Sequence, residues 1–79
     1  MNGELLRKLR EAAGIKQLDL ALAAGIDNSA LSLYESGRRG LTAEVAGLLV
    51  ALIDSMLSER TDEYLRLRAR ATDGKELVA

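Results

Sequence analysis

The sequence contains neither cysteine nor histidine among its 79 residues. Without cysteine the chain can form no disulfide and no thiolate metal site. The lack of histidine also excludes the usual zinc, haem and imidazole–nucleophile sites. We therefore expect a protein that carries no metal and no cofactor and that is not an enzyme.

Long hydrophobic runs are also absent. Charged residues interrupt the N-terminal segment from Glu4 onward, and no segment approaches the roughly 18–20 apolar residues that span a bilayer. We expect a cytoplasmic protein with no membrane partner. A chain this short forms one domain at most and buries only roughly 60–65 % of its unfolded surface, so it needs well-packed helices or a partner subunit.

The formal net charge of −1 disfavours a nucleic-acid partner, because Lys and Arg supply most non-specific affinity for phosphate. The two halves of the chain differ, however. Residues 1–40 carry six basic and five acidic groups, whereas residues 41–79 carry five basic and seven acidic groups. A surface that faces nucleic acid should therefore lie in the first half.

Apolar residues recur at helical spacing through the first half of the chain. The pattern predicts a first helix over residues 4–13, stopped by Gly14, and a second helix over residues 17–24. Gly25 can adopt the positive φ that a tight turn requires, and Asp27 can cap a third helix that ends near residue 35.

A fourth helix should begin at Thr42, where its first turn also carries Glu44. The residues 58–60 form a polar break, and a fifth helix is expected over residues 61–71, although one continuous helix from residue 42 is the alternative. The predicted fold is an all-α, compact five-helix bundle. Residues 1–57 would form one domain, and residues 58–79 a C-terminal helix and tail that serve as a dimerisation element.

Residues 17–35 form the centre of this organisation. Two short apolar-patterned helices flank Gly25, and the second helix carries small polar residues that can reach another molecule: Asp27, Asn28, Ser29 and Ser32. This pattern is typical of a helix-turn-helix whose second helix contacts DNA, so we expect residues 1–57 to be a helix-turn-helix DNA-binding domain.

The run LRKLREAAGIKQLDLALAAGIDNSALSLYESGRRG, residues 6–40, resembles the lambda-repressor and Cro-like helix-turn-helix family, also called XRE-type. With the apolar helix over residues 42–52, the resemblance covers about two-thirds of the chain. The features in register are Arg10, Gly14, Gln17, Leu20, Ala21, Gly25, Leu31, Glu35 and Gly37. The family implies a five-helix bundle with its third helix in the major groove of double-stranded DNA.

The resemblance also implies roles for individual residues. The residues that would face base edges are Asn28, Ser29, Ser32 and Leu33. Those that would contact the phosphate backbone are Lys16, Gln17, Arg38 and Arg39. Arg10 and Glu35 would form a structural ion pair between the first and third helices. This chain departs from the family at Lys16, at Leu33, and at Leu18 and Leu22, where the second helix is normally polar.

The fourth predicted helix carries more apolar residues than one buried stripe requires. The surplus can pack against the fifth helix through Tyr64, Leu65 and Leu67, or it can form a dimer contact, for which we select Leu49, Ile53, Met56 and Leu57. Arg66, Arg68 and Arg70 are interpreted as a solvated face. A two-fold dimer would double the base contacts on a palindrome.

The resulting hypothesis is a sequence-specific DNA-binding transcriptional regulator, a repressor that binds a palindromic operator as a homodimer. Its recognition helix would span about residues 28–35, and its half-sites would lie about one DNA turn apart. The chain is too short for a ligand-sensing domain, so no small-molecule ligand is expected. The alternative is an antitoxin-like protein-interaction module that contacts a protein partner through Leu18, Leu22 or the C-terminal tail.

Overall fold

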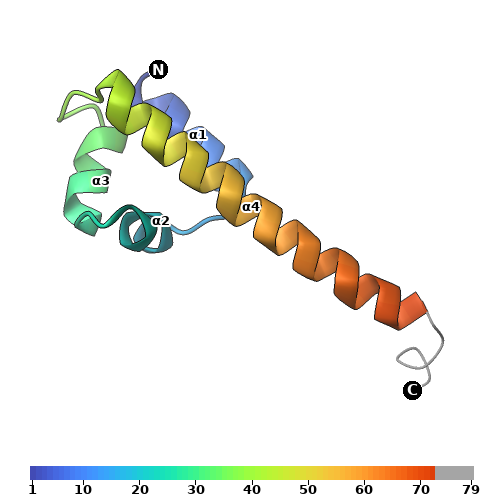
Figure 1. The fold of residues 1–79 in the computed structure, drawn as a ribbon. Helices are drawn as coiled ribbons and strands as arrows, with labels where there is room; N and C mark the ends of the chain where they lie inside the picture. The colour runs from blue at the N-terminus through green and yellow to red at the C-terminus, as the bar shows by residue number, and fades with distance from the viewer. Residues whose placement is uncertain (73–79) are drawn as a thin grey trace.

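The computed structural model describes residues 1–72, and these residues form four α-helices. Their bounds are α1 Gly3–Ala12, α2 Gln17–Ala24, α3 Asn28–Glu35 and α4 Ala43–Thr72. The first three helices and the beginning of α4 form a compact body, from which the rest of α4 projects (Figure 1). The molecule is therefore elongated, measuring 52 × 20 × 19 Å. None of the described helices is long and apolar enough to cross a membrane.

Short-range hydrogen bonds and glycines define the helix ends. The Asn2 side-chain oxygen accepts a hydrogen bond from the Leu5 amide at 2.8 Å, and the Thr42 hydroxyl oxygen accepts one from the Val45 amide at 3.2 Å. Gly25 ends α2 with a φ of +68°, a left-handed conformation that favours glycine. Asp27 occupies the N-cap position of α3, but its side chain makes no capping hydrogen bond, so the predicted cap does not form.

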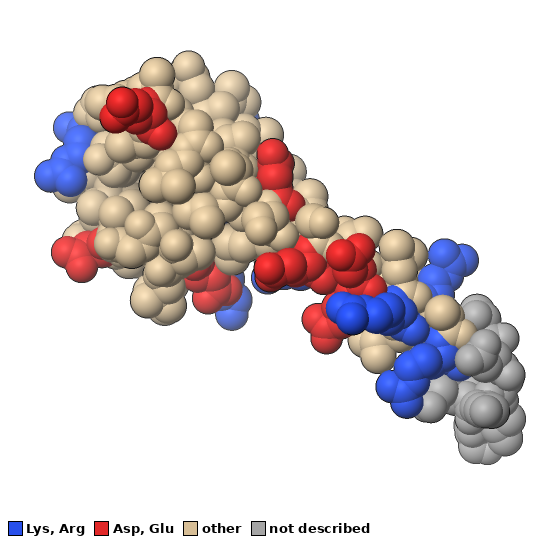
Figure 2. Space-filling model, viewed as in Figure 1, with Lys and Arg blue, Asp and Glu red and all other residues tan. Residues whose placement is uncertain are grey.

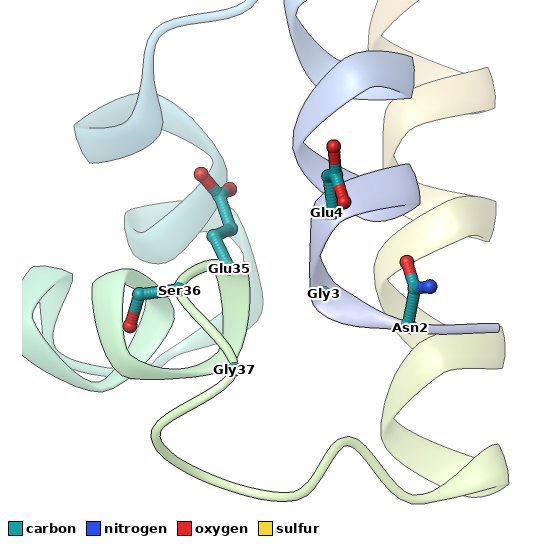
Figure 3. A pocket seen from close by; sticks show the side chains of 6 residues that line it. All are labelled: Asn2, Gly3, Glu4, Glu35, Ser36 and Gly37. Atoms are coloured by element: carbon teal, nitrogen blue, oxygen red, sulfur yellow. The ribbon is translucent and has the colours of Figure 1, made fainter.

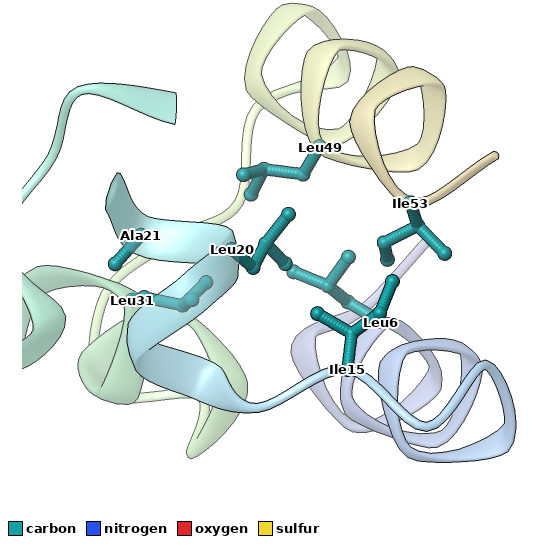
Figure 4. Packing of buried hydrophobic residues seen from close by; sticks show 7 residues of the cluster. All are labelled: Leu6, Ile15, Leu20, Ala21, Leu31, Leu49 and Ile53. Carbon is teal, nitrogen blue, oxygen red and sulfur yellow. The ribbon is translucent and has the colours of Figure 1, made fainter. Parts of the chain in front are cut away.

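The hydrophobic core lies where all four helices meet (Figure 4). Its largest fully buried side chains come from four different helices: Leu6, Leu20, Leu31 and Leu49. Burial of each contributes roughly 1.5–3 kcal/mol relative to exposure. Ala21 is also fully buried, and its small side chain lets α2 and α3 approach each other. This packing fixes α3 on the body.

The predicted five-helix bundle is wrong in its helix count, because α4 continues through residues 58–60 without a break. Thr61, the expected start of the fifth helix, lies inside α4, and its hydroxyl donates to the Leu57 carbonyl at 2.9 Å, one turn earlier. The segment that follows Gly47 contains no glycine or proline up to residue 72, so nothing in its backbone chemistry ends the helix. The all-α class is confirmed for the described residues.

The continuous α4 also changes the environment of its apolar residues. Leu49 is fully buried and Ile53 is 4 % exposed, so both belong to the core of the chain itself and not to a surface available for a dimer. Of the other two residues predicted to form a dimer contact, Met56 is half-buried and Leu57 is exposed. The described residues contain no fifth helix that could cover Tyr64, Leu65 and Leu67, and all three are at least half exposed.

Candidate nucleic-acid interface

A buried ion pair joins α1 to the end of α3. Arg10 Nε donates to Glu35 Oε2 at 2.8 Å, and Arg10 Nη2 donates to Glu35 Oε1 at 2.9 Å. The third guanidinium nitrogen, Nη1, donates to the Ile15 carbonyl at 2.8 Å. The hydrogen bond with Glu35 raises the pKa of Arg10 above its ordinary value, so the guanidinium stays charged. Two parallel bonds between planar groups fix the orientation of α3 on the body.

Gln17 extends this network to α2. Its Nε2 donates to Glu35 Oε1 at 3.2 Å, and the side chain is half-buried. The first residue of α2 is thereby held against the last residue of α3. A side chain restrained in this way loses little entropy when it meets a further partner.

The exposed side of α3 carries the residues expected to face base edges. Asn28, Ser29 and Ser32 are exposed and Leu33 is half-buried, whereas Leu31 and Glu35 of the same helix are buried. Their spacing of one, three and one residues places the four candidates on one side of the helix. With its side chains an α-helix is about 10–12 Å in diameter, close to the width of the DNA major groove of about 12 Å.

The loop that follows α3 carries two arginines beside that exposed side. The backbone N–H groups of Arg38 and Arg39 both donate to the Leu33 carbonyl, at 3.0 and 3.1 Å. Gly37, with a φ of +79°, makes this tight return possible. The Arg39 guanidinium also lies 5.7 Å from the centre of the Tyr34 ring. The two cations are therefore held at the end of α3.

Lys16 is exposed and occupies the N-cap position of α2, where its side chain makes no capping bond. Basic side chains are visible at the end of the body opposite the projecting part of α4 (Figure 2). Leu18 and Leu22 are 54 % and 70 % exposed on α2. The structure thus brings base-facing and phosphate-facing candidates to neighbouring elements, α2, α3 and the loop after α3.

A hollow of about 240 Å³ lies beside the contact between the start of α1 and the end of α3 (Figure 3). It is lined by Asn2, Gly3, Glu4, Glu35, Ser36 and Gly37. Each polar side chain in this lining already has a partner: Asn2 caps α1, Glu4 pairs with Lys8, Glu35 pairs with Arg10 and Ser36 donates to the Leu33 carbonyl. The hollow therefore offers no free set of catalytic groups.

Sequence reasoning missed the role of Arg60. Its Nη1 donates to the Gly14 carbonyl at 2.6 Å, which satisfies a backbone acceptor beyond the end of α1. This bond joins residues 46 positions apart, and no local sequence pattern indicates it. It marks the point where α4 leaves the body.

Comparison with known proteins also indicates a helix-turn-helix in the first two-thirds of the chain. The family model described as helix-turn-helix matches residues 6–57. This range contains all the base-facing and phosphate-facing candidates. No solved structure matches the chain significantly.

Three curated relatives are named as HTH-type transcriptional regulatory proteins. The chain is 38 % identical over 71 residues to one from Thermococcus kodakarensis, 37 % over 62 residues to one from Thermococcus gammatolerans and 40 % over 58 residues to one from Methanocella arvoryzae. These matches cover 90, 78 and 73 % of this chain but 22, 20 and 18 % of the relatives. The chain thus spans about a fifth of the length of these relatives.

Proposed function

This chain belongs to the helix-turn-helix family, and we propose that it is a sequence-specific DNA-binding transcriptional regulator that places α3 in the major groove. The observation that carries the proposal is the exposed polar side of α3, held rigidly by the Arg10–Glu35–Gln17 network. A recognition element needs this combination of free polar groups and a fixed backbone.

The four candidate residues on the exposed side of α3 contact the base edges. The Asn28 amide can form two hydrogen bonds with N6 and N7 of an adenine, and the hydroxyls of Ser29 and Ser32 can donate or accept. Leu33, being half-buried, can still present its edge to a thymine methyl group. Each good contact contributes about 1–3 kcal/mol of discrimination between bases.

Four residues that flank α3 bind phosphate: Lys16 at the N-cap of α2, Gln17 at its first position, and Arg38 and Arg39 on the loop after α3. Three of these residues are cations. If each neutralises one phosphate, the logarithm of the affinity falls by about 0.9 per cation for each tenfold rise in salt concentration. A protomer with three such contacts should therefore bind DNA modestly.

The modest number of contacts supports a homodimer on a palindromic operator, since a second copy doubles both the base and the phosphate contacts. In this proposal residues 1–57 bind DNA and the described residues from 58 onward contribute to self-association. A dimer bound across a promoter would exclude polymerase, so we propose repression as its effect.

The test is selection of binding sequences from a random duplex library by the purified protein at two salt concentrations. Enrichment of an inverted repeat is expected, and Asn28→Ala should relax preference at one base position in each half-site. Arg7→Ala, a change at an exposed position on α1, is the matched control and should leave the selected sequence unchanged. Equal recovery of all sequences by the unmodified protein would refute sequence-specific DNA binding.

A second candidate function is a protein-interaction module, because Leu18 and Leu22 are exposed on α2, four residues apart. The C-terminal tail, also expected to contact a partner, lies outside the described residues. Replacing both leucines by glutamine should leave DNA selection unchanged if they contact a protein. Loss of the selected sequence would instead assign the two leucines to the DNA-facing surface.

A further inference from the structure

The side of α4 that faces the core continues beyond the body. Leu49, Ile53 and Arg60 contact the body, and Tyr64, Leu67 and Ala71 follow Arg60 at spacings of four, three and four residues. Such spacing keeps all of them on one side of a helix. Tyr64 and Leu67 are 62 % and 54 % exposed, so this distal stripe of Tyr64, Leu67 and Ala71 has apolar groups to bury.

Charge is segregated along the same projecting part of α4. Beyond Arg60, which is bonded to the body, Asp62 and Glu63 come first, and the basic residues Arg66, Arg68 and Arg70 come after them. Figure 2 shows the acidic side chains where α4 leaves the body and the basic ones toward its far end. Among the ion pairs of the described residues, none involves Glu63 or Arg68.

We propose that the distal stripe pairs with the distal stripe of a second copy of this chain, and that the two α4 helices run antiparallel. Antiparallel pairing sets the acidic part of each helix beside the basic part of the other. Parallel pairing would set like charges side by side, which is unfavourable. The proposal specifies the interface of the homodimer proposed above and therefore rests on it.

The position of the body gives a second reason for the antiparallel orientation. The distal stripe lies on the same side of α4 as the residues that contact α1 and α2. In a parallel pair, the beginning of the partner helix would occupy the space that α1 and α2 already fill. In an antiparallel pair, only the two projecting parts overlap, so the bodies do not collide.

The stripe also sets the register. The stripe side chains of the two helices pack in successive layers, and these layers match when Tyr64 lies opposite Leu67 of the partner subunit. This register places the two-fold axis between residues 65 and 66. Arg60 then lies opposite Ala71 of the partner subunit, at the edge of the body. On one flank of the helix contact, Glu63 lies near Arg70 of the partner subunit, and their opposite charges attract each other.

This register separates the two helix-turn-helix bodies. Leu49, in the core, lies about 25 Å along α4 from the axis, so the two cores would be about 50 Å apart. That distance exceeds the roughly 34–36 Å of one DNA turn. The operator half-sites should therefore lie more than one turn apart, in contrast to the one-turn spacing expected from the sequence.

The interface is tested by measuring mass in solution, by sedimentation equilibrium over roughly 1 µM to 1 mM protein. The 8.5 kDa chain should associate to about twice that mass. Leu67→Gln should weaken association at least about tenfold, because each dimer loses two buried leucines. Leu65→Gln is the matched control: it changes the same residue type on the other side of α4, at a similar exposure of 50 %, and should alter association by less than about twofold.

The orientation is tested by the distance between spin labels. The chain has no native cysteine, so Ala51→Cys gives one label on each copy, at an exposed position of α4. The antiparallel register predicts about 45–50 Å between the labels, whereas a parallel pair would give less than about 30 Å. Circular dichroism of each variant checks that the helices are retained.

The outcomes separate this inference from the proposed function. A dimer that Leu67→Gln leaves intact, or a short label distance, would refute the antiparallel distal stripe while the homodimer stands. A mass of one chain at all concentrations would refute both the stripe pairing and the homodimer. Sequence-specific DNA binding is measured separately by the library selection, so it can survive either result.

Discussion

Replacing Arg10 by methionine should lower the free energy of unfolding by about 3–5 kcal/mol, because it leaves a buried charge without its partner. The Glu35 side chain is only 3 % exposed and receives two of its three hydrogen bonds from Arg10. After the substitution, Gln17 would be its one remaining donor among the described residues, at 3.2 Å. Methionine fills much of the same volume, so the loss reports the missing charge more than a cavity.

Thermal unfolding followed by circular dichroism measures this effect. For a domain of this size each kcal/mol shifts Tm by roughly 4–8 °C, so Arg10→Met should lower Tm by at least about 12 °C. The matched control is Arg7→Met, because Arg7 forms an ion pair with Glu11 on the same helix at 3.2 Å, with both side chains more than half exposed. An exposed pair of this kind contributes at most about 0.5 kcal/mol.

Two further measurements sharpen the test. The double variant Arg10→Met with Glu35→Leu should be more stable than Arg10→Met alone, because the unpaired carboxylate is removed. The pKa of Arg10 is raised in the folded state, so its contribution to stability is fully present below its ordinary pKa and is lost only as the pH rises through the higher folded value. Titration of Arg10 should therefore add no pH dependence between about pH 6 and 9. If Arg10→Met costs no more than Arg7→Met, the buried pair does not hold α3.

Three other changes are predicted. Gly3→Ala should destabilise the fold, since its new Cβ would clash with the backbone carbonyl oxygen of Tyr34. Gly47→Ala, with open space around it, should instead stabilise α4 by about 0.5–1 kcal/mol, and chemical denaturation measures both effects. Ile53→Asp should prevent cooperative unfolding, because the site is 4 % exposed, while Leu48→Asp, at a site 52 % exposed, should leave the unfolding midpoint nearly unchanged. Arg38→Ala should weaken binding to every DNA sequence alike and reduce the salt slope by about one unit; an unchanged slope would show that its side chain does not contact phosphate.

The first three helices could be predicted from the sequence because their ends depend on local chemistry. Gly14 and Gly25 both adopt positive φ in the structure, and each follows a helix whose apolar spacing is clear. Leu20 and Leu31 are fully buried, as their positions in the apolar pattern indicate. Local propensity and tertiary packing agree in this part of the chain, so each supports the same boundaries.

The second half could not be predicted to the same extent. A polar run such as residues 58–60 is compatible with a loop and equally with an exposed stretch of helix, and only the three-dimensional structure distinguishes them. Apolar density likewise did not reveal which leucines of α4 face the core: Leu49 is fully buried and its neighbour Leu48 is 52 % exposed. The bond from Arg60 to Gly14 decides where α4 leaves the body, and it connects distant parts of the chain.

The net charge of −1 is a poor guide to the proposed interface because the acidic groups are not distributed evenly. Glu35 is neutralised within the body by Arg10, so it does not oppose phosphate binding next to α3. Glu59, Asp62 and Glu63 lie well along α4, with Asp62 about 20 Å beyond Leu49 along the helix, more than twice the Debye length of about 8 Å at physiological salt. Their repulsion of DNA at α3 is therefore largely screened. Near α3 the cations Lys16, Arg38 and Arg39 outnumber the exposed carboxylate of Asp27 at its N-cap, so a chain with a negative total charge can still present a positive surface to DNA.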